Sequence, residues 1–400
     1  MPVHGRQPLH RFSKQTNKFW VVYVISIVFS FHSVLIAYNN SAYMERFVTP
    51  EVIGALYAIS AALAVLSFLF ISRVLRLIGN TKLTLWMATL EIISLLMLGF
   101  ATDPRTAIIA FVIFMTVNPL IYLSIDIFSE SLIGDNEGTT GTKRGITLGL
   151  MSISAAAAPM TMGLIVGSDA SNLPNVYFAA AGVALLFVLV VIAKFDDFKD
   201  PKYREVKVLR TIQEFWENRD VRGVFLAHFL LQFFFAWMVI YLPLYLASHI
   251  GLTWGEIGSI MAVALLAYVF FEYPIGYIAD KYTGEKEMMA FGFVILAIAS
   301  ASVSYMGHAT VLGWMILLFI SRVGASLVEA TTESYFFKHV NGTNAKVMSF
   351  FRLTRPLASL LGALGGTVTL FYLPFELIFV VLGFMMIPGI FITLTIKDTK

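Results

Sequence analysis

The chain has 400 residues, of which 58% are hydrophobic and only 13% are charged, and its mean hydropathy is +0.79. Soluble domains carry about 25% charged residues, so this composition excludes an ordinary soluble protein and predicts a polytopic membrane protein. The net charge of +3 is small. The absence of cysteine excludes disulfides, iron–sulfur clusters and thiolate metal sites, and the seven histidines show no pair at metal-ligand spacing.

Apolar runs in chain order predict twelve membrane-spanning helices, because one span needs roughly 20 apolar residues. The first run follows Arg6, Arg11 and Lys14, and we expect it to be an uncleaved span because it is too long for a signal-peptide core. The runs of the first half lie near 18–38, 52–71, 82–100, 106–128, 145–166 and 174–194. Those of the second half lie near 222–246, 255–277, 288–306, 310–336, 347–370 and 374–396.

Basic residues set the expected orientation. Most of the 28 lysines and arginines lie at the termini, or in and beside the loops that follow even-numbered spans. Arg46 and Arg105 lie on the opposite side, and Arg322, Arg352 and Arg355 lie inside spans. The positive-inside rule then predicts a multi-pass protein of the plasma (inner) membrane with both termini in the cytoplasm.

A charged segment at 195–221 separates the two sets of spans. Apolar residues such as Leu209 and Ile212 recur in it at helical spacing, which favours an amphipathic helix on the membrane surface. A solvated linker helix is the alternative. The expected units are an N-terminal six-helix bundle at 1–194, a cytoplasmic linker at 195–221 and a C-terminal six-helix bundle at 222–400.

Two short patterns of the first half return in the second half. Thr49-x-x-x-Ile53-Gly54 returns as Thr253-x-x-x-Ile257-Gly258, and Asp126-x-x-x-Glu130-Ser131 returns as Glu329-x-x-x-Glu333-Ser334. All four copies lie beside or within long apolar runs. Many secondary transporters consist of two like halves that face each other across a central cleft, so the repeat predicts a carrier.

One loop carries a family resemblance. Residues 272–286 read Glu-Tyr-Pro-Ile-Gly-Tyr-Ile-Ala-Asp-Lys-Tyr-Thr-Gly-Glu-Lys. This run resembles the loop signature of the major facilitator superfamily, Gly-x-Leu-Ala-Asp-Arg-x-Gly-Arg-Lys, and its matching residues are Gly276, Ala279, Asp280, Gly284 and Lys286. With twelve spans in two halves, the resemblance covers essentially the whole chain. It implies an all-α membrane protein of two pseudo-symmetric six-helix bundles that works by alternating access.

The resemblance also assigns a gate and shows departures from the family. It implies that Asp280 latches the two halves in one state and that Lys286 belongs to the same loop; capping of a tight loop is the alternative for Asp280.

In the first-half copy of the loop, Arg76 stands where the aspartate is expected. The arginine usual on the fourth span is also missing, because Asn118 occupies the position that matches Arg322. The charged machinery is therefore expected in the second half.

Ionisable residues inside spans are candidate functional groups, because each costs at least about 2.5–3.5 kcal/mol at the centre of a helix. Arg322, Glu329 and Glu333 are spaced to project from one face of the tenth span. Arg352 and Arg355 share a face of the eleventh span. We expect an ion-pair cluster between these two helices, which either exchanges partners during transport or holds the helices together.

Three further carboxylates complete the candidate charge relay. Asp126 and Glu130 lie on the fourth span with no embedded arginine near them in sequence, so the arginines of the eleventh span could reach them across the two halves. Glu272 on the eighth span is a candidate proton site. Glu91 on the third span is expected to be a hydrogen-bonded packing group rather than a substrate ligand.

The first, fourth, seventh and tenth spans line the cavity if the resemblance holds. Their polar and aromatic candidates are His32, Asn39, Asn40, His228, Gln232 and Trp237. A packing role is the alternative for His32. A cavity with few polar groups and many rings favours amphiphilic or weakly polar solutes.

The sequence therefore predicts a proton-coupled secondary transporter that exports a small organic, amphiphilic solute. Uptake by symport, uniport of a small metabolite and lipid transport are the alternatives. No phosphate-binding loop or catalytic constellation occurs, so we expect neither ATP drive nor an enzyme, and no cofactor beyond a proton gradient. The expected partners are the solute and membrane lipids, without nucleic acid, and the chain is expected to act as a monomer.

Overall fold

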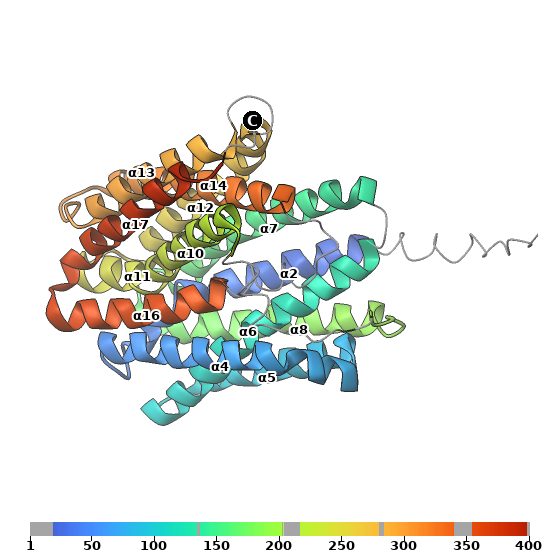
Figure 1. The fold of residues 1–400 in the computed structure, drawn as a ribbon. Helices are drawn as coiled ribbons and strands as arrows, with labels where there is room; N and C mark the ends of the chain where they lie inside the picture. Colours follow the sequence, from blue (N-terminus) through green and yellow to red (C-terminus); the bar gives the residue numbers. More distant parts are fainter. Residues whose placement is uncertain are drawn as a thin grey trace, which may run out of the picture.

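The computed structural model describes residues 19–133, 137–201, 203, 217–279, 284–339 and 354–397. Within these ranges the regular structure is entirely helical, and long helices run roughly side by side through the molecule (Figure 1). The prediction of an all-α membrane protein is confirmed.

Within the described residues, each predicted span falls on a long helix, to which short helical segments are joined in the seventh and twelfth spans, and the start of the eleventh span at 347–353 lies outside the described residues. The first half contains α2 (Phe19–Ala37), α3 (Asn40–Met44), α4 (Pro50–Ile78), α5 (Asn80–Phe100), α6 (Pro104–Ile133), α7 (Glu137–Val166), η1 (Ala170–Asn172) and α8 (Leu173–Lys194). The second half contains α10 (Arg219–Ile240), α11 (Leu242–Leu244), the π-helix η2 (Tyr245–His249), α12 (Trp254–Ile278), α13 (Glu285–Val303), α14 (Val311–His339), α16 (Thr354–Tyr372), η4 (Phe375–Leu377) and α17 (Ile378–Leu394).

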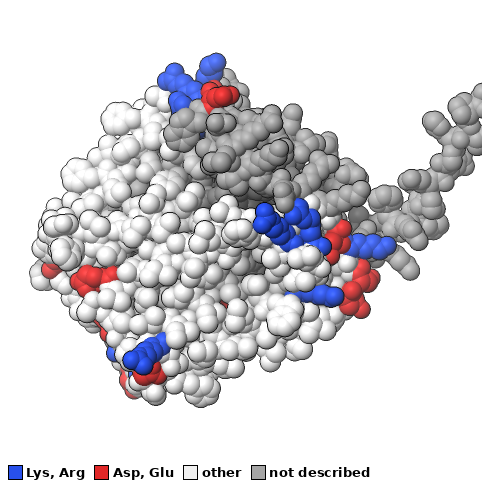
Figure 2. Space-filling view, turned by 60° about the horizontal axis from the view of Figure 1, so that its bottom comes forward, with Lys and Arg blue, Asp and Glu red and all other residues white. Residues whose placement is uncertain are grey.

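Eleven helical segments of the described residues are long and apolar enough to cross a membrane. The remaining long helix, α16, occupies the place of the predicted eleventh span. Large apolar side chains such as Trp86, Phe100 and Leu164 are exposed on the helix surfaces. Figure 2 shows a broad uncharged face with charged side chains gathered toward its margins. These features fit an integral, multi-pass membrane protein.

Local chemistry explains where several helices begin. Pro50 opens α4 directly after the extended Thr49, where its missing N–H has no helical partner to lose. Gly79 joins α4 to α5 with φ 78°, and Gly284 precedes α13 with φ 80°. A residue with a Cβ is strained in this left-handed region, so glycine serves as the junction in both halves.

The two halves meet along two seams, with α7 packed against α12 and α4 packed against α16. The repeated glycines lie in these seams. A Cβ on Gly54 of α4 would collide with the hydroxyl of Thr367 in α16, and a Cβ on Gly258 of α12 would lie 2.8 Å from the Cα of Gly163 in α7. The sequence repeat therefore marks corresponding close contacts in the two seams.

The end of the bundle opposite Phe19 and Lys397 is closed, and we call it the far end. There the amide of Gly255 donates to the carbonyl of Gly167 over 3.2 Å. The hydroxyl of Ser248 donates to Glu45 Oε2 over 2.7 Å. Both hydrogen bonds join the first half to the second, so the halves touch in this conformation beside the first turns of α4 and α12.

Candidate functional site

A charged cluster joins α12, α14 and α16 in the second half. Arg355 Nη2 lies 3.5 Å from Glu329 Oε1, and the Glu329 side chain is 16% exposed while that of Arg355 is 61% exposed. Glu272 of α12 interacts electrostatically with Glu329, Glu333 and Arg355. The structure thus brings together three predicted carboxylates and one predicted arginine. We call Glu272, Glu329, Glu333 and Arg355 the carboxylate cluster.

The carboxylate cluster also touches the first half. Ser152 of α7 donates its hydroxyl proton to Glu272 Oε2 over 3.2 Å. This hydrogen bond crosses the α7–α12 seam, so the charge on Glu272 acts on a contact between the halves. Among the described residues, the cluster holds three carboxylates and one arginine. The carboxylate cluster therefore lies where the two halves meet.

Arg322 lies deeper in the second half, away from the carboxylate cluster. It is 2% exposed, and its guanidinium lies 5.1 Å from the centre of the Phe234 ring of α10. Among the described residues, its Nη1 has no hydrogen-bond partner. Glu329 shares its helix face but lies seven residues away, about 10 Å along the axis. Arg322 therefore lies apart from Glu329 and Glu333, although the three residues were predicted to share one face of the helix.

A second buried polar group lies inside the first half. His32 Nε2 is 3.2 Å from Glu91 Oε1, and both side chains are fully buried. Asn118 Nδ2 donates to the same Oε1 over 2.7 Å and to Ser33 Oγ over 2.9 Å. These contacts link α2, α5 and α6. Glu91 is therefore a hydrogen-bonded group within the bundle.

The geometry of His32 requires an additional proton in this group. Its Nδ1 lies 2.9 Å from the carbonyl oxygen of Ala180, which only accepts, so Nδ1 carries a hydrogen. A neutral imidazole would then turn the lone pair of Nε2 toward the carboxylate oxygen of Glu91. That arrangement is repulsive unless either the imidazole or the carboxyl group holds a further proton. The pair is consequently neutral overall, as a buried pair must be.

The other cavity candidates take part in packing. Asn39 donates to the carbonyl of Leu173 over 3.3 Å. Tyr177 donates to the Asn40 side chain over 3.0 Å. The remaining contacts lie in the second half: His228 with Thr332 (3.4 Å) and Gln232 (3.3 Å), and Trp237 Nε1 with the carbonyl of Gly362 (2.6 Å). In this conformation these groups, and His32, bond within their own half.

The remaining predicted charge-relay and gate residues can be placed only by their position and exposure. Asp126 is half-buried on α6, and Glu130 is exposed four residues later. Lys286 is half-buried in the first turn of α13. Two predicted gate residues lie outside the described residues: Asp280, expected to latch the halves through its loop, and Arg352, expected in the ion-pair cluster of the tenth and eleventh spans.

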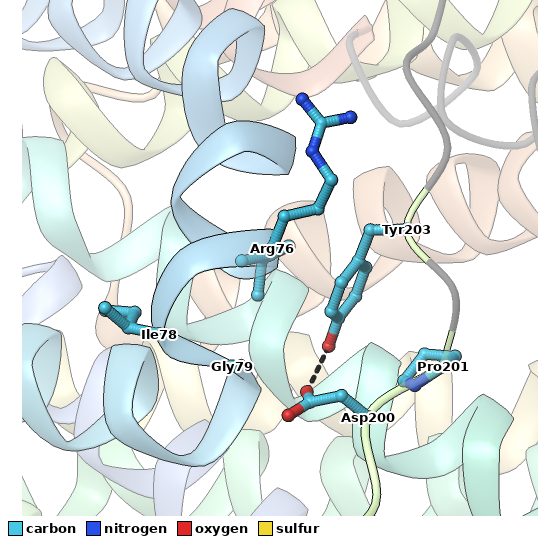
Figure 3. Close-up of a pocket in the computed structure, with 7 residues that line it drawn as sticks. Arg76, Ile78, Gly79, Asp200, Pro201 and Tyr203 are labelled. Atoms are coloured by element: carbon cyan, nitrogen blue, oxygen red, sulfur yellow. Dashed lines mark hydrogen bonds between the residues drawn. The ribbon is translucent and has the colours of Figure 1, made fainter.

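Sequence reasoning missed an aspartate that supports the first half. Asp200, which follows α8, accepts a 2.7 Å hydrogen bond from the backbone N–H of Asn80, the first residue of α5. Tyr203 also donates to Asp200 (Figure 3). Burial and the Asp200 carboxylate together raise the pKa of Tyr203. The linker thus brings an acidic group to the α4–α5 loop, where Arg76 replaces the expected aspartate.

Asp200 also lines a cavity of about 510 Å³ beside Arg76 and Gly79 (Figure 3). A Cβ on Gly79 would collide with the Asp200 carboxylate. The glycine therefore permits both the positive φ and the close approach of Asp200. A carboxylate at the start of a helix stabilises its unpaired N–H groups and its positive dipole end.

Substituting Asp200 with alanine is expected to lower the free energy of unfolding by about 1 kcal/mol, because α5 loses a capping group. The midpoint of thermal unfolding in detergent measures this effect. Asp196→Ala is the matched control, since within the described part of the chain Asp196 accepts from the neighbouring Asp197 amide and caps no helix. Equal midpoints for the two variants would contradict a capping role for Asp200.

Two lobes that meet along paired seams, with ionisable groups buried among apolar helices, define the class of a membrane transporter rather than an enzyme. Residues 224–400 match the family model of the Major Facilitator Superfamily. The resemblance seen in the sequence is confirmed, and the chain has the major facilitator fold of a secondary transporter. A search of curated proteins finds no match.

Solved structures with this fold cover nearly the whole chain. A mutant of the nucleoside transporter NupG aligns with a TM-score of 0.73 and 15% identity, over 94% of this chain and 99% of its own. NupG itself aligns with a TM-score of 0.70 and 15% identity, over 94% and 98%. An auto-inhibited POT family peptide transporter aligns with a TM-score of 0.75 and 11% identity, over 94% and 96%. At these identities the likeness concerns the fold.

Proposed function

We propose that this secondary transporter couples the movement of a small organic, amphiphilic solute to a proton gradient, and that it works as an exporter. The observation that carries the coupling is the hydrogen bond from Ser152 to Glu272 across the α7–α12 seam. It ties an ionisable group of the second half directly to the first half. The other members of the carboxylate cluster lie within electrostatic reach of Glu272.

The proposed coupling follows from simple electrostatics. With all three carboxylates charged, Arg355 offsets only part of the repulsion among the described members of the cluster, and ionised groups in a low-dielectric environment interact strongly. A proton on Glu272 or Glu329 removes that repulsion and changes the acceptor available to Ser152. The relative stability of open and closed seams then depends on the proton, which is the requirement for coupled alternating access.

The proposed solute class rests on a group of aromatic side chains near the centre of the second half. Phe234 carries the guanidinium of Arg322 on its face, and Phe235 lies 6.2 Å from Tyr268, ring centre to ring centre. Flat apolar groups pack well against such rings. The structural neighbours are named as nucleoside and peptide transporters, so a nucleoside and a dipeptide belong in the set of test solutes.

The test is flux in proteoliposomes made from the full chain. Solutes are first selected by thermal stabilisation of the protein at two pH values, from a set containing uridine, a dipeptide, benzoate and a fluorescent amphiphilic cation. Flux of each binder is then measured with and without a pH gradient. We expect the gradient to accelerate wild-type flux in the direction opposite to proton movement.

Glu329→Gln is expected to abolish the response to the gradient while solute exchange at equal pH persists, because glutamine keeps the shape but takes up no proton. Glu287→Gln is the matched control, since Glu287 is an exposed residue at the start of α13. A wild-type flux indifferent to the gradient would reject coupling and leave a uniporter. Acceleration in the direction of proton movement would reject export in favour of uptake by symport.

A further inference from the structure

Arg322 is a buried cation that the proposed coupling does not use. It lies eleven residues into α14, about 16 Å along the helix axis, which is near the middle of a bilayer and too deep for its guanidinium to reach water at either surface. A charged group at this depth costs at least about 2.5–3.5 kcal/mol unless a partner compensates it. A partner is therefore expected.

The expected protein partners are missing or occupied. Glu329, on the same face of α14, is paired with Arg355. In the first half, Asn118 matches Arg322 and bonds to Glu91 of α5. The positions of α13 that correspond to Glu91 in the repeat are Val294 and Ile295, which are apolar. Within the described residues, no side chain supplies an anion to Arg322.

A second polar group without a hydrogen-bond partner among the described residues lies within electrostatic reach of Arg322. The hydroxyl of Tyr268 on α12 is buried and has no hydrogen-bond partner among the described residues. Tyr268 interacts electrostatically with Arg322 and Glu329, with Tyr38, which follows α2 in the first half, and with Glu272. The guanidinium and the hydroxyl therefore lie close to the junction of the two halves, beside the rings of Phe234 and Phe235.

From this arrangement we infer that Arg322 and Tyr268 bind the anionic group of the transported solute, whose apolar part packs on the neighbouring rings. The solute is then an aromatic or amphiphilic carboxylate. A guanidinium presents paired N–H donors that match a carboxylate, and a phenol hydroxyl adds a third donor. This inference rests on the proposed transport function and names the chemistry of its solute.

The substitution Arg322→Met distinguishes a loss of solute binding from a loss of folding stability. Methionine keeps much of the apolar packing of the arginine stem and removes the charge. Since Arg322 has no internal counter-ion, the ligand-free variant is expected to unfold at the same temperature as wild type or higher. A clear drop in the unfolding midpoint, as for a broken buried ion pair, would show that Arg322 already has a partner in the protein and would overturn the inference.

Binding is tested on purified protein with benzoate and indole-3-acetate, each paired with its uncharged carboxamide. Wild type is expected to bind and be stabilised by the carboxylates more than by the amides. Arg322→Met is expected to weaken carboxylate binding about 10- to 100-fold and to leave amide binding unchanged. Tyr268→Phe is expected to weaken carboxylate binding less. Arg105→Gln, which changes an exposed arginine at the start of α6, is the control.

Equal binding of carboxylates and amides by wild type, or an unchanged preference in Arg322→Met, would overturn the inference. Stabilisation by added chloride alone, with no further gain from the organic acids, would also overturn it by assigning Arg322 to a structural ion. These measurements use no pH gradient. A transporter that prefers carboxylates but ignores the gradient would therefore refute the coupling while leaving the role of Arg322 intact.

Discussion

Glu91→Ala is expected to destabilise the protein by about 3–5 kcal/mol, the largest effect expected of any single truncation within the first half. The Glu91 carboxylate accepts from Asn118 over 2.7 Å and lies 3.2 Å from His32, and the His32 and Glu91 side chains are completely buried. Alanine would remove the oxygen that Asn118 and His32 share and would leave a cavity among buried side chains. Thermal unfolding in detergent, followed by tryptophan fluorescence, measures the loss.

Glu91→Gln is expected to lose much less stability. A glutamine oxygen at the position of Oε1 still accepts from Asn118, and the side chain keeps the volume of glutamate, so only the contact of that oxygen with His32 changes. Glu287→Ala is the control for removing an exposed glutamate. A small effect of Glu91→Ala, comparable with that of Glu287→Ala, would show that the buried pair contributes little.

Gly258→Ala is expected to move the protein away from the conformation that is closed at the far end. The added Cβ would lie 2.8 Å from the Cα of Gly163 and would also collide with the carbonyl of Pro159. Both neighbours are backbone atoms, which cannot turn aside as a side chain can. Overpacking of this kind costs about 1–3 kcal/mol, which shifts a two-state equilibrium about 5- to 150-fold.

The chain contains no cysteine, so spin labels can be placed on Thr102→Cys and His308→Cys without background. These exposed positions lie in the far-end loops that follow α5 and α13. The distance distribution between the labels should lengthen in Gly258→Ala. Gly255→Ala is the matched control on the same helix, because a Cβ there meets no atom within 4 Å. Identical distributions in wild type and Gly258→Ala would contradict tight closure at this seam.

The helices could be predicted from the sequence because their cause is local. A run of apolar residues long enough to cross a membrane must satisfy its own backbone hydrogen bonds, and a helix does so without other parts of the chain. The runs near 52–71 and 106–128 accordingly fall on α4 (Pro50–Ile78) and α6 (Pro104–Ile133). The structural helices extend past the predicted ends because polar flanks such as Arg76 continue the helix beyond the apolar core.

Pairing between helices could be predicted only in part. Helical spacing places Arg322 and Glu329 on one face of α14. It does not reveal that Glu329 pairs with Arg355, or that Arg322 Nη1 has no hydrogen-bond partner among the described residues. In the same way, His32 was considered for the cavity and Glu91 for packing, yet the structure joins them in one group. The distances between helices decide such pairs, and one-dimensional spacing contains no information about them.

The sequence by itself determined the membrane setting, the helices, the twofold repeat and the likeness to the major facilitator superfamily, because hydropathy and short motifs act through neighbouring residues. Only the tertiary structure decided which buried charges meet, which glycines lie in the seams and that Asp200 supplies the acidic group at the start of α5. Those contacts join residues far apart in the chain, and they depend on how rigid helices pack against one another.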